Sequence, residues 1–211
     1  MLFNSIDFAI FLPIVFVLYW FVANRNLKSQ NFLIVISSAV FYGWWDWRFL
    51  SLILFSSVLD FTIGNLLRNE NKFAKRKLLL WLSILINLGF LGFFKYFNFF
   101  IDSFKNTFTF LGQDLNLSSL NIILPVGISF YTFQTLSYTI DVYRKQLEPT
   151  KDIVAFFAFV SFFPQLVAGP IERASNLLPQ FYKSRIFNYD LAINGLRQIL
   201  WGLFKKIVIA D

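Results

Sequence analysis

Residues 124–144 read LPVGISFYTFQTLSYTIDVYR, a largely apolar stretch with polar side chains at regular intervals. At helical spacing, its polar groups and a glycine share one face, which carries Gly127, Tyr131, Gln134, Tyr138 and Asp141. A second face is apolar and carries Val126, Phe130, Phe133 and Ile140. Pro125 suits the opening turn of a helix, where its missing N–H is not needed. The pattern predicts a helix whose polar face is sheltered from lipid.

The composition of the whole chain indicates that this helix lies in a membrane. Of the 211 residues, 57% are hydrophobic and 15% are charged, whereas soluble domains are about 45–50% apolar and about 25% charged. The mean hydropathy is +0.60. A soluble fold of this size could not cover so much apolar surface, and a disordered chain has the opposite composition. We therefore expect an all-α, polytopic membrane protein in which residues 1–211 form one incomplete transmembrane domain.

The apolar runs define the expected spans. They lie at about 8–22, 31–45, 49–67, 78–94, 122–140, 153–169 and 191–210. Several are shorter than the ~20 residues that cross a bilayer, so the number of crossings stays open. Residues 1–7 contain no Lys or Arg, which argues against a cleaved signal peptide and for a retained first span.

Amphipathic segments are expected beside these spans. In the first, apolar residues recur at three- and four-residue steps: Phe97, Phe100, Phe104, Phe108 and Leu111. This spacing is typical of a helix lying in the membrane interface. Residues 190–211 show a similar division into a polar stripe and an apolar stripe. We interpret them as a second interfacial helix.

The distribution of basic residues predicts the orientation. If the first five runs each cross once, residues 24–30, 68–77 and 141–152 lie on one side and contain ten Lys and Arg residues. The opposite side contains three, which are Arg48, Lys95 and Lys105. Loops rich in Lys and Arg face the cytoplasm, so the N-terminus is expected outside. The net charge of +7 is explained by these loops and does not indicate a nucleic-acid partner.

A second unusual stretch, FFPQLVAGPIER at residues 162–173, predicts an interrupted helix. Pro164 removes a backbone donor, and Gly169-Pro170 forces an extended or turned backbone. Non-helical backbone at membrane depth persists only where protein or a water-filled cavity satisfies it. We expect a broken or re-entrant segment near 162–173.

The candidate site residues come from these two stretches. We expect pore-lining or structural roles for Tyr131, Gln134, Asp141, Gln165, Glu172 and Arg173. Hydrogen bonding between neighbouring helices is an open alternative for the polar face, and an ion pair or helix cap for the two charges. The chain contains no Cys and no His, which removes thiolates, the usual general base and the commonest metal ligands. No catalytic residue and no metal site are predicted.

Residues 124–144 and 162–173 resemble the membrane-bound O-acyltransferase family, in particular its bacterial alginate O-acetyltransferase branch. Further matching stretches are MLFNSIDF (1–8), YGWWDW (42–47), FKYFNFF (94–100) and GLFKKIVIAD (202–211). The resemblance implies a ring of membrane helices around a narrow pore. It also implies transfer of an acyl group, such as acetyl, from acetyl-coenzyme A or an acyl carrier protein towards an extracytoplasmic polysaccharide such as alginate. No bound cofactor is implied.

The resemblance also implies a bacterial cytoplasmic membrane, the lipid bilayer as surroundings, and an extracytoplasmic acyltransferase partner protein. The family's essential histidine lies in its second half, and this chain has no histidine. We therefore expect the N-terminal portion of such a protein, inactive and poorly stable by itself. Two alternatives stay open: a transporter or channel component with a substrate site at Pro164–Pro170, and a non-catalytic membrane scaffold.

Overall fold

The computed structural model describes residues 1–110, 125–166 and 169–210. Within these ranges every regular element is helical, which confirms the all-α prediction. The α-helices are α1 (Ile6–Val17), α2 (Leu27–Asp46), α3 (Leu50–Asn69), α4 (Phe73–Phe110), α5 (Ile128–Tyr143), α6 (Ile153–Val160), α7 (Phe163–Leu166), α8 (Ala174–Leu177) and α9 (Tyr189–Phe204). Short 3₁₀ or π segments are η1 (Leu18–Val22), η2 (Ala23–Arg25), η3 (Trp47–Phe49), η4 (Leu178–Phe181) and η5 (Lys205–Ala210).

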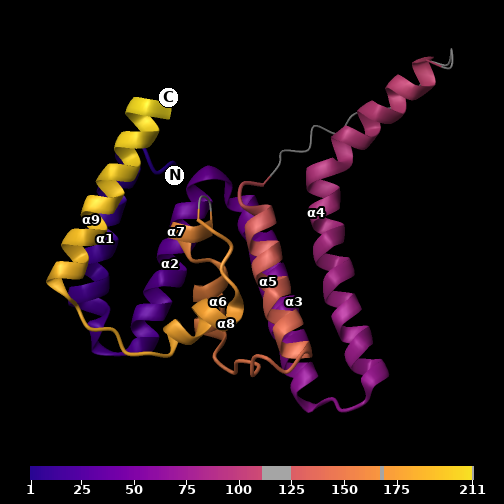
Figure 1. The fold of residues 1–211 in the computed structure, drawn as a ribbon, viewed down its shortest axis with the longest axis horizontal. Coiled ribbons are helices and arrows are strands. Elements are labelled where there is room, and N and C mark those ends of the chain that lie inside the picture. Colours follow the sequence, from indigo (N-terminus) through magenta and orange to yellow (C-terminus); the bar gives the residue numbers. More distant parts are fainter. Residues whose placement is uncertain (111–124, 167–168, 211) are drawn as a thin grey trace.

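Several helices are long and apolar enough to cross a bilayer. Among the described residues, three continuous helical segments meet this criterion: Ile6–Arg25, Leu27–Asn69 and Phe73–Lys105. The second contains α2 and α3, which form a hairpin (Figure 1). Each has 20 residues, enough for a hydrocarbon core of about 30 Å. The prediction of a multi-pass membrane protein is confirmed.

Side-chain caps set the start of many helices. Asn26 Oδ1 accepts the N–H of Ser29 at 2.7 Å before α2. Asp152 Oδ1 accepts the N–H groups of Val154 and Ala155 at 2.9 and 3.0 Å before α6. Such caps satisfy backbone donors that the first helical turn leaves free. They fix where the chain leaves each loop.

Helix α5 lies at the centre of the fold. It packs against α3, α4, α6 and α8, and α6 also packs against α2. The predicted polar face of α5 is buried: Tyr131, Gln134, Tyr138 and Asp141 are each at most 6% exposed, whereas Phe133 is 44% exposed. Burial of this face is therefore confirmed.

Two helix boundaries differ from the sequence predictions. Pro125 does not open α5; it lies in a turn, and the helix begins at Ile128 after Gly127 with φ of 78°. A Cβ atom on Gly127 would lie 2.8 Å from the carbonyl oxygen of Leu166, so the backbone approach requires glycine.

Residues 97–110 are not a separate helix, because α4 runs without interruption from Phe73 to Phe110. Figure 1 shows its C-terminal part turning away from the other helices. Phe99, Phe100 and Phe104 remain 54–65% exposed, as expected for an apolar stripe facing lipid. Leu111, the last residue of the predicted stripe, lies outside the described residues.

The helix is interrupted in the second unusual stretch, as predicted. Helix α6 ends at Val160, α7 covers only Phe163–Leu166, and non-helical backbone precedes α8. The three basic loops, at residues 24–30, 68–77 and 141–152, lie at one end of the molecule (Figure 1). Both termini lie at the other end.

Candidate functional site

A buried polar network centred on Asp60 joins α3, α4 and α5. Asp60 is 0% exposed. Its Oδ1 accepts hydrogen bonds from the hydroxyl of Ser83 and from Thr139 Oγ1, the latter at 2.8 Å. Its Oδ2 accepts the Asn87 amide at 2.8 Å. Neutral donors from α4 and α5 therefore satisfy both carboxyl oxygens of Asp60 on α3.

The network continues along the same helices. Ser56 Oγ donates to Asn87 Oδ1 at 2.6 Å and lies 3.3 Å from Thr135 Oγ1. Each helix thus contributes polar residues one turn apart: Ser56 and Asp60 from α3, Ser83 and Asn87 from α4, Thr135 and Thr139 from α5. Residues four apart lie on the same helical face, so the pairs meet in two layers. The arrangement fixes three membrane helices in register.

The candidate residues on α5 lie beside this network. Tyr131 is 2% exposed, lines a cavity of about 10 Å³ with Ser56 and Asn87, and its hydroxyl has no hydrogen-bond partner among the described residues. Gln134 is also 2% exposed and donates to the carbonyl of Phe159 at 2.9 Å. These side chains link or face neighbouring helices.

Asp141, at the last turn of α5, is 6% exposed, and its Oδ2 has no partner among the described residues. Its main-chain carbonyl accepts the N–H groups of Gln146 and Leu147. The carboxyl therefore lies near the end of α5 where the α5–α6 loop begins.

The candidates in the interrupted segment make local contacts, with the segment itself or with the start of α8. Gln165 Nε2 donates to the carbonyl of Pro170 at 2.6 Å and so supports the non-helical chain. Glu172 accepts the Asn176 amide at 3.1 Å. Arg173 is exposed, and its carbonyl accepts the N–H of Asn176 in the first turn of α8. Pore lining by these six candidate residues stays a prediction.

The sequence analysis did not predict the Asp60 network, because its residues are spread over three helices and only the polar face of α5 stands out within one helix. The sequence does contain a pattern that could have indicated it: three apolar helical segments each carry two polar side chains four residues apart, and Asp60 is the acidic one. Polar groups inside a bilayer are costly and are retained where they find partners or serve function. Within residues 1–110, 125–166 and 169–210, no group of three or more Asp and Glu side chains is placed to hold a metal ion.

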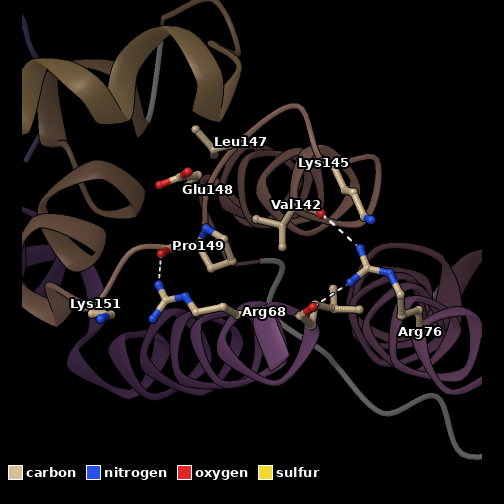
Figure 2. A pocket seen from close by; sticks show the side chains of 9 residues that line it. Arg68, Arg76, Val142, Lys145, Leu147, Glu148, Pro149 and Lys151 are labelled. Atoms are coloured by element: carbon tan, nitrogen blue, oxygen red, sulfur yellow. Dashed lines mark hydrogen bonds between the residues drawn. The ribbon is translucent and has the colours of Figure 1, made fainter. Parts of the chain in front are cut away.

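A second feature is a basic cavity of about 670 Å³ at the end that holds the three basic loops (Figure 2). It is lined by Leu67, Arg68, Arg76, Val142, Lys145, Leu147, Glu148, Pro149 and Lys151. These residues come from the end of α3, the first turns of α4, the end of α5 and the α5–α6 loop. The cavity thus brings together cations that are far apart in the sequence.

Comparison with known proteins identifies the relatives of this chain. Over its full length it is 38% identical to a protein of Pseudomonas syringae pv. tomato named "Probable alginate O-acetylase AlgI". The identity to the protein of the same name from Pseudomonas aeruginosa is also 38%. The chain is a homologue of the alginate O-acetylases. The "Peptidoglycan O-acetyltransferase" of Helicobacter pylori is 34% identical, again across the whole chain.

These relatives confirm the resemblance to the alginate O-acetyltransferase branch of the membrane-bound O-acyltransferase family. The chain spans about 40% of the length of the two Pseudomonas proteins and 45% of the Helicobacter protein. No family model matches the chain, and no solved structure gives a significant match.

Proposed function

We propose that this chain is the N-terminal, membrane-embedded part of an O-acetyltransferase that passes an acetyl group from a cytoplasmic donor towards an extracytoplasmic polysaccharide such as alginate. The proposal rests on one observation: over its whole length, this chain is similar to parts of proteins named for O-acetylation of alginate and of peptidoglycan. Both names describe acetylation of a polysaccharide-containing polymer of the cell surface. We therefore infer that the protein to which this chain belongs catalyses the same class of reaction, O-acetylation.

Transfer across a membrane needs a polar route through helices that are otherwise apolar. Tyr131 and Asp141 supply buried polar atoms without partners among the described residues, both on α5. Gln134 and Gln165 support the helices and the interrupted backbone nearby. We assign Tyr131, Gln134, Asp141, Gln165, Glu172 and Arg173 to the lining or support of this route.

The gathering of the basic loops at one end supports the proposed orientation. Loops rich in Lys and Arg face the cytoplasm, so the donor, acetyl-coenzyme A or an acyl carrier protein, arrives at that end. The N-terminus then lies outside a bacterial cytoplasmic membrane. An extracytoplasmic acyltransferase partner would receive the acetyl group there.

In the proposed chemistry, an acceptor hydroxyl attacks the carbonyl carbon of the donor thioester. A base takes the hydroxyl proton, the new ester C–O bond forms, and the C–S bond breaks to release a thiol that gains a proton. The 211 residues contain no histidine, so we place the base outside them. This chain contributes the scaffold and part of the route.

A complementation experiment tests the proposal. The complete reading frame is expressed in an alginate-producing strain that lacks its own O-acetylase, and O-acetyl groups on secreted alginate are measured by proton NMR. We expect acetylation to return, and we expect none from the chain terminated after Asp211. Unmodified polymer, despite the complete protein in the membrane, would contradict the proposal. Transmembrane flux without covalent change would support a transporter instead.

A further inference from the structure

The basic cavity has a strong excess of positive charge. Its lining includes four cations, Arg68, Arg76, Lys145 and Lys151, and one carboxylate, Glu148. Across the described ranges the ion pairs are Arg48 with Asp46 and Lys75 with Glu70, so no carboxylate is paired with any of these four cations.

Glu70 is close in sequence to Arg68 of the cavity, but its carboxylate interacts with residues outside the cavity lining. The N–H of Lys72 donates to its carboxylate at 2.9 Å and lowers the pKa of that carboxyl. The same carboxylate lies 3.7 Å from the Lys75 ammonium. The carboxylate of Glu70 therefore does not neutralise the cavity.

The two arginines are held in place by the main chain. Arg76 donates to the carbonyls of Leu67 at 2.5 Å and Val142 at 3.4 Å, and Arg68 donates to the carbonyl of Pro149 (Figure 2). Arg76 also donates to the carbonyl of Tyr143 at 2.8 Å. Carbonyl groups orient a guanidinium but leave its net charge uncompensated. Both arginines are half-buried, which reduces screening by water. The result is a fixed positive field inside the cavity.

The two lysines are placed differently. Lys145 and Lys151 are exposed, so their ammonium groups can move towards a ligand. Lys145 occupies the left-handed region, with φ of 59°, directly after α5. That position favours glycine or asparagine, yet a lysine occupies it, and Figure 2 shows its side chain near Arg76. A long cationic side chain therefore stands where the backbone favours a small residue.

We propose that this cavity binds a phosphate group at the membrane surface. Guanidinium and ammonium groups together recognise phosphate oxygens well. A volume of about 670 Å³ exceeds the needs of a single phosphate and accommodates the headgroup of an anionic phospholipid. Its place at the helix ends puts it at headgroup depth. The phosphate comes either from such a lipid or from a soluble phosphate compound, and the site does not depend on the proposed acetyl transfer.

Native mass spectrometry tests this proposal on the protein purified from its complete reading frame in a neutral detergent. Phosphatidylglycerol and phosphatidylcholine of equal chain length are compared as bound adducts. The test variant is Lys145→Asn with Lys151→Gln, which leaves the structural arginines intact and suits the backbone at 145. The matched control is Lys28→Gln with Lys183→Gln, which removes two exposed lysines outside the cavity.

We expect the wild type to retain phosphatidylglycerol over phosphatidylcholine, and the test variant to bind it about tenfold more weakly, because each basic residue near an anionic surface contributes measurably. The control should stay within twofold. Inorganic pyrophosphate is then added to the wild type. Displacement of the lipid assigns the site to soluble phosphates as well, and retention assigns it to the lipid.

Two results would overturn the proposal. One is equal loss of lipid binding in the test and control variants, which would show general surface charge instead of a site. The other is a wild type that neither prefers phosphatidylglycerol nor binds pyrophosphate.

Discussion

The hydroxyl of Thr139 on α5 donates a 2.8 Å hydrogen bond to the carboxyl of Asp60 on α3, which lies 79 residues earlier in the chain. Ser83 and Asn87 of α4 donate to the same carboxyl. One acidic side chain therefore ties three helices together inside an apolar bundle. Hydrogen bonds between membrane helices contribute about 1 kcal/mol each, so their sum is a substantial part of the stability of the bundle.

Replacing Asp60 by alanine should destabilise the protein strongly. The change leaves the buried donors of Ser83, Asn87 and Thr139 without their acceptor, which we expect to lower the free energy of unfolding by about 3 kcal/mol. Unfolding in detergent, followed by tryptophan fluorescence, measures the effect. Asp102→Ala on the exposed part of α4 is the control, with a change within about 0.5 kcal/mol. Equal effects of the two variants would show that the hydrogen bonds of Asp60 do not stabilise the fold.

Close packing between α3 and α5 makes Gly64 sensitive to substitution. A Cβ atom there would lie 2.7 Å from the hydroxyl and a ring carbon of Tyr138. We expect Gly64→Ala to cost about 1–3 kcal/mol through overpacking. Gly89→Ala on α4, where nothing lies within 4 Å, should be neutral or slightly stabilising in the same assay. A tolerated Gly64→Ala would show that α3 and α5 are not so close.

Arg76 joins the ends of α3 and α5 through the carbonyls of Leu67 and Tyr143. Arg76→Ala should lower the free energy of unfolding by about 2 kcal/mol, and Arg76→Lys should recover only part of it because an ammonium lacks the planar fork. The control is Lys77→Ala, an exposed cation in the same turn. Full rescue by lysine would mean that charge alone matters at this position.

Orientation can be measured with single cysteines, because residues 1–211 contain none. In intact cells, a membrane-impermeant thiol reagent should label Asn4→Cys and leave Lys75→Cys unlabelled. Both should react after lysis. Labelling of Lys75→Cys from outside would reverse the proposed topology.

The sequence predicts the buried face of α5 well. Its polar residues recur at helical spacing, and Tyr131, Gln134 and Tyr138 are all buried while Phe133 faces outward. This succeeds because periodicity within one helix reports directly which face avoids lipid. The alternation of spans and basic loops also predicts that residues 24–30, 68–77 and 141–152 lie at the same end, and in the structure they do (Figure 1).

The sequence does not predict which side chains of different helices contact one another. The one-turn spacing of Ser83 and Asn87 is visible in α4, but nothing in it identifies Asp60 as their partner. The approach of Gly127 to the Leu166 carbonyl likewise depends on the interrupted segment folding back. Contacts across 27 or more residues, such as Asp60 with Asn87, are set by tertiary packing.

The amphipathic helix predicted at 97–111 is helical as far as Phe110, but it is continuous with the preceding span and does not stand between two spans. Its position in the membrane interface stays a prediction. Residues 93–110 contain neither Gly nor Pro, so no residue stops the helix that begins at Phe73. The change from an all-apolar to an amphipathic pattern marks a change of surroundings along one helix.

A vesicle assay with labelled acetyl groups measures directly whether the protein moves acetyl groups across a membrane to alginate. Right-side-out vesicles carrying the protein from its complete reading frame and its extracytoplasmic partner are loaded with [¹⁴C]acetyl-coenzyme A, and deacetylated alginate is added outside. We expect radiolabelled ester on the external alginate, released by mild base. Label that stays inside the vesicles, with alginate unmodified and both proteins intact, would contradict the proposed transfer.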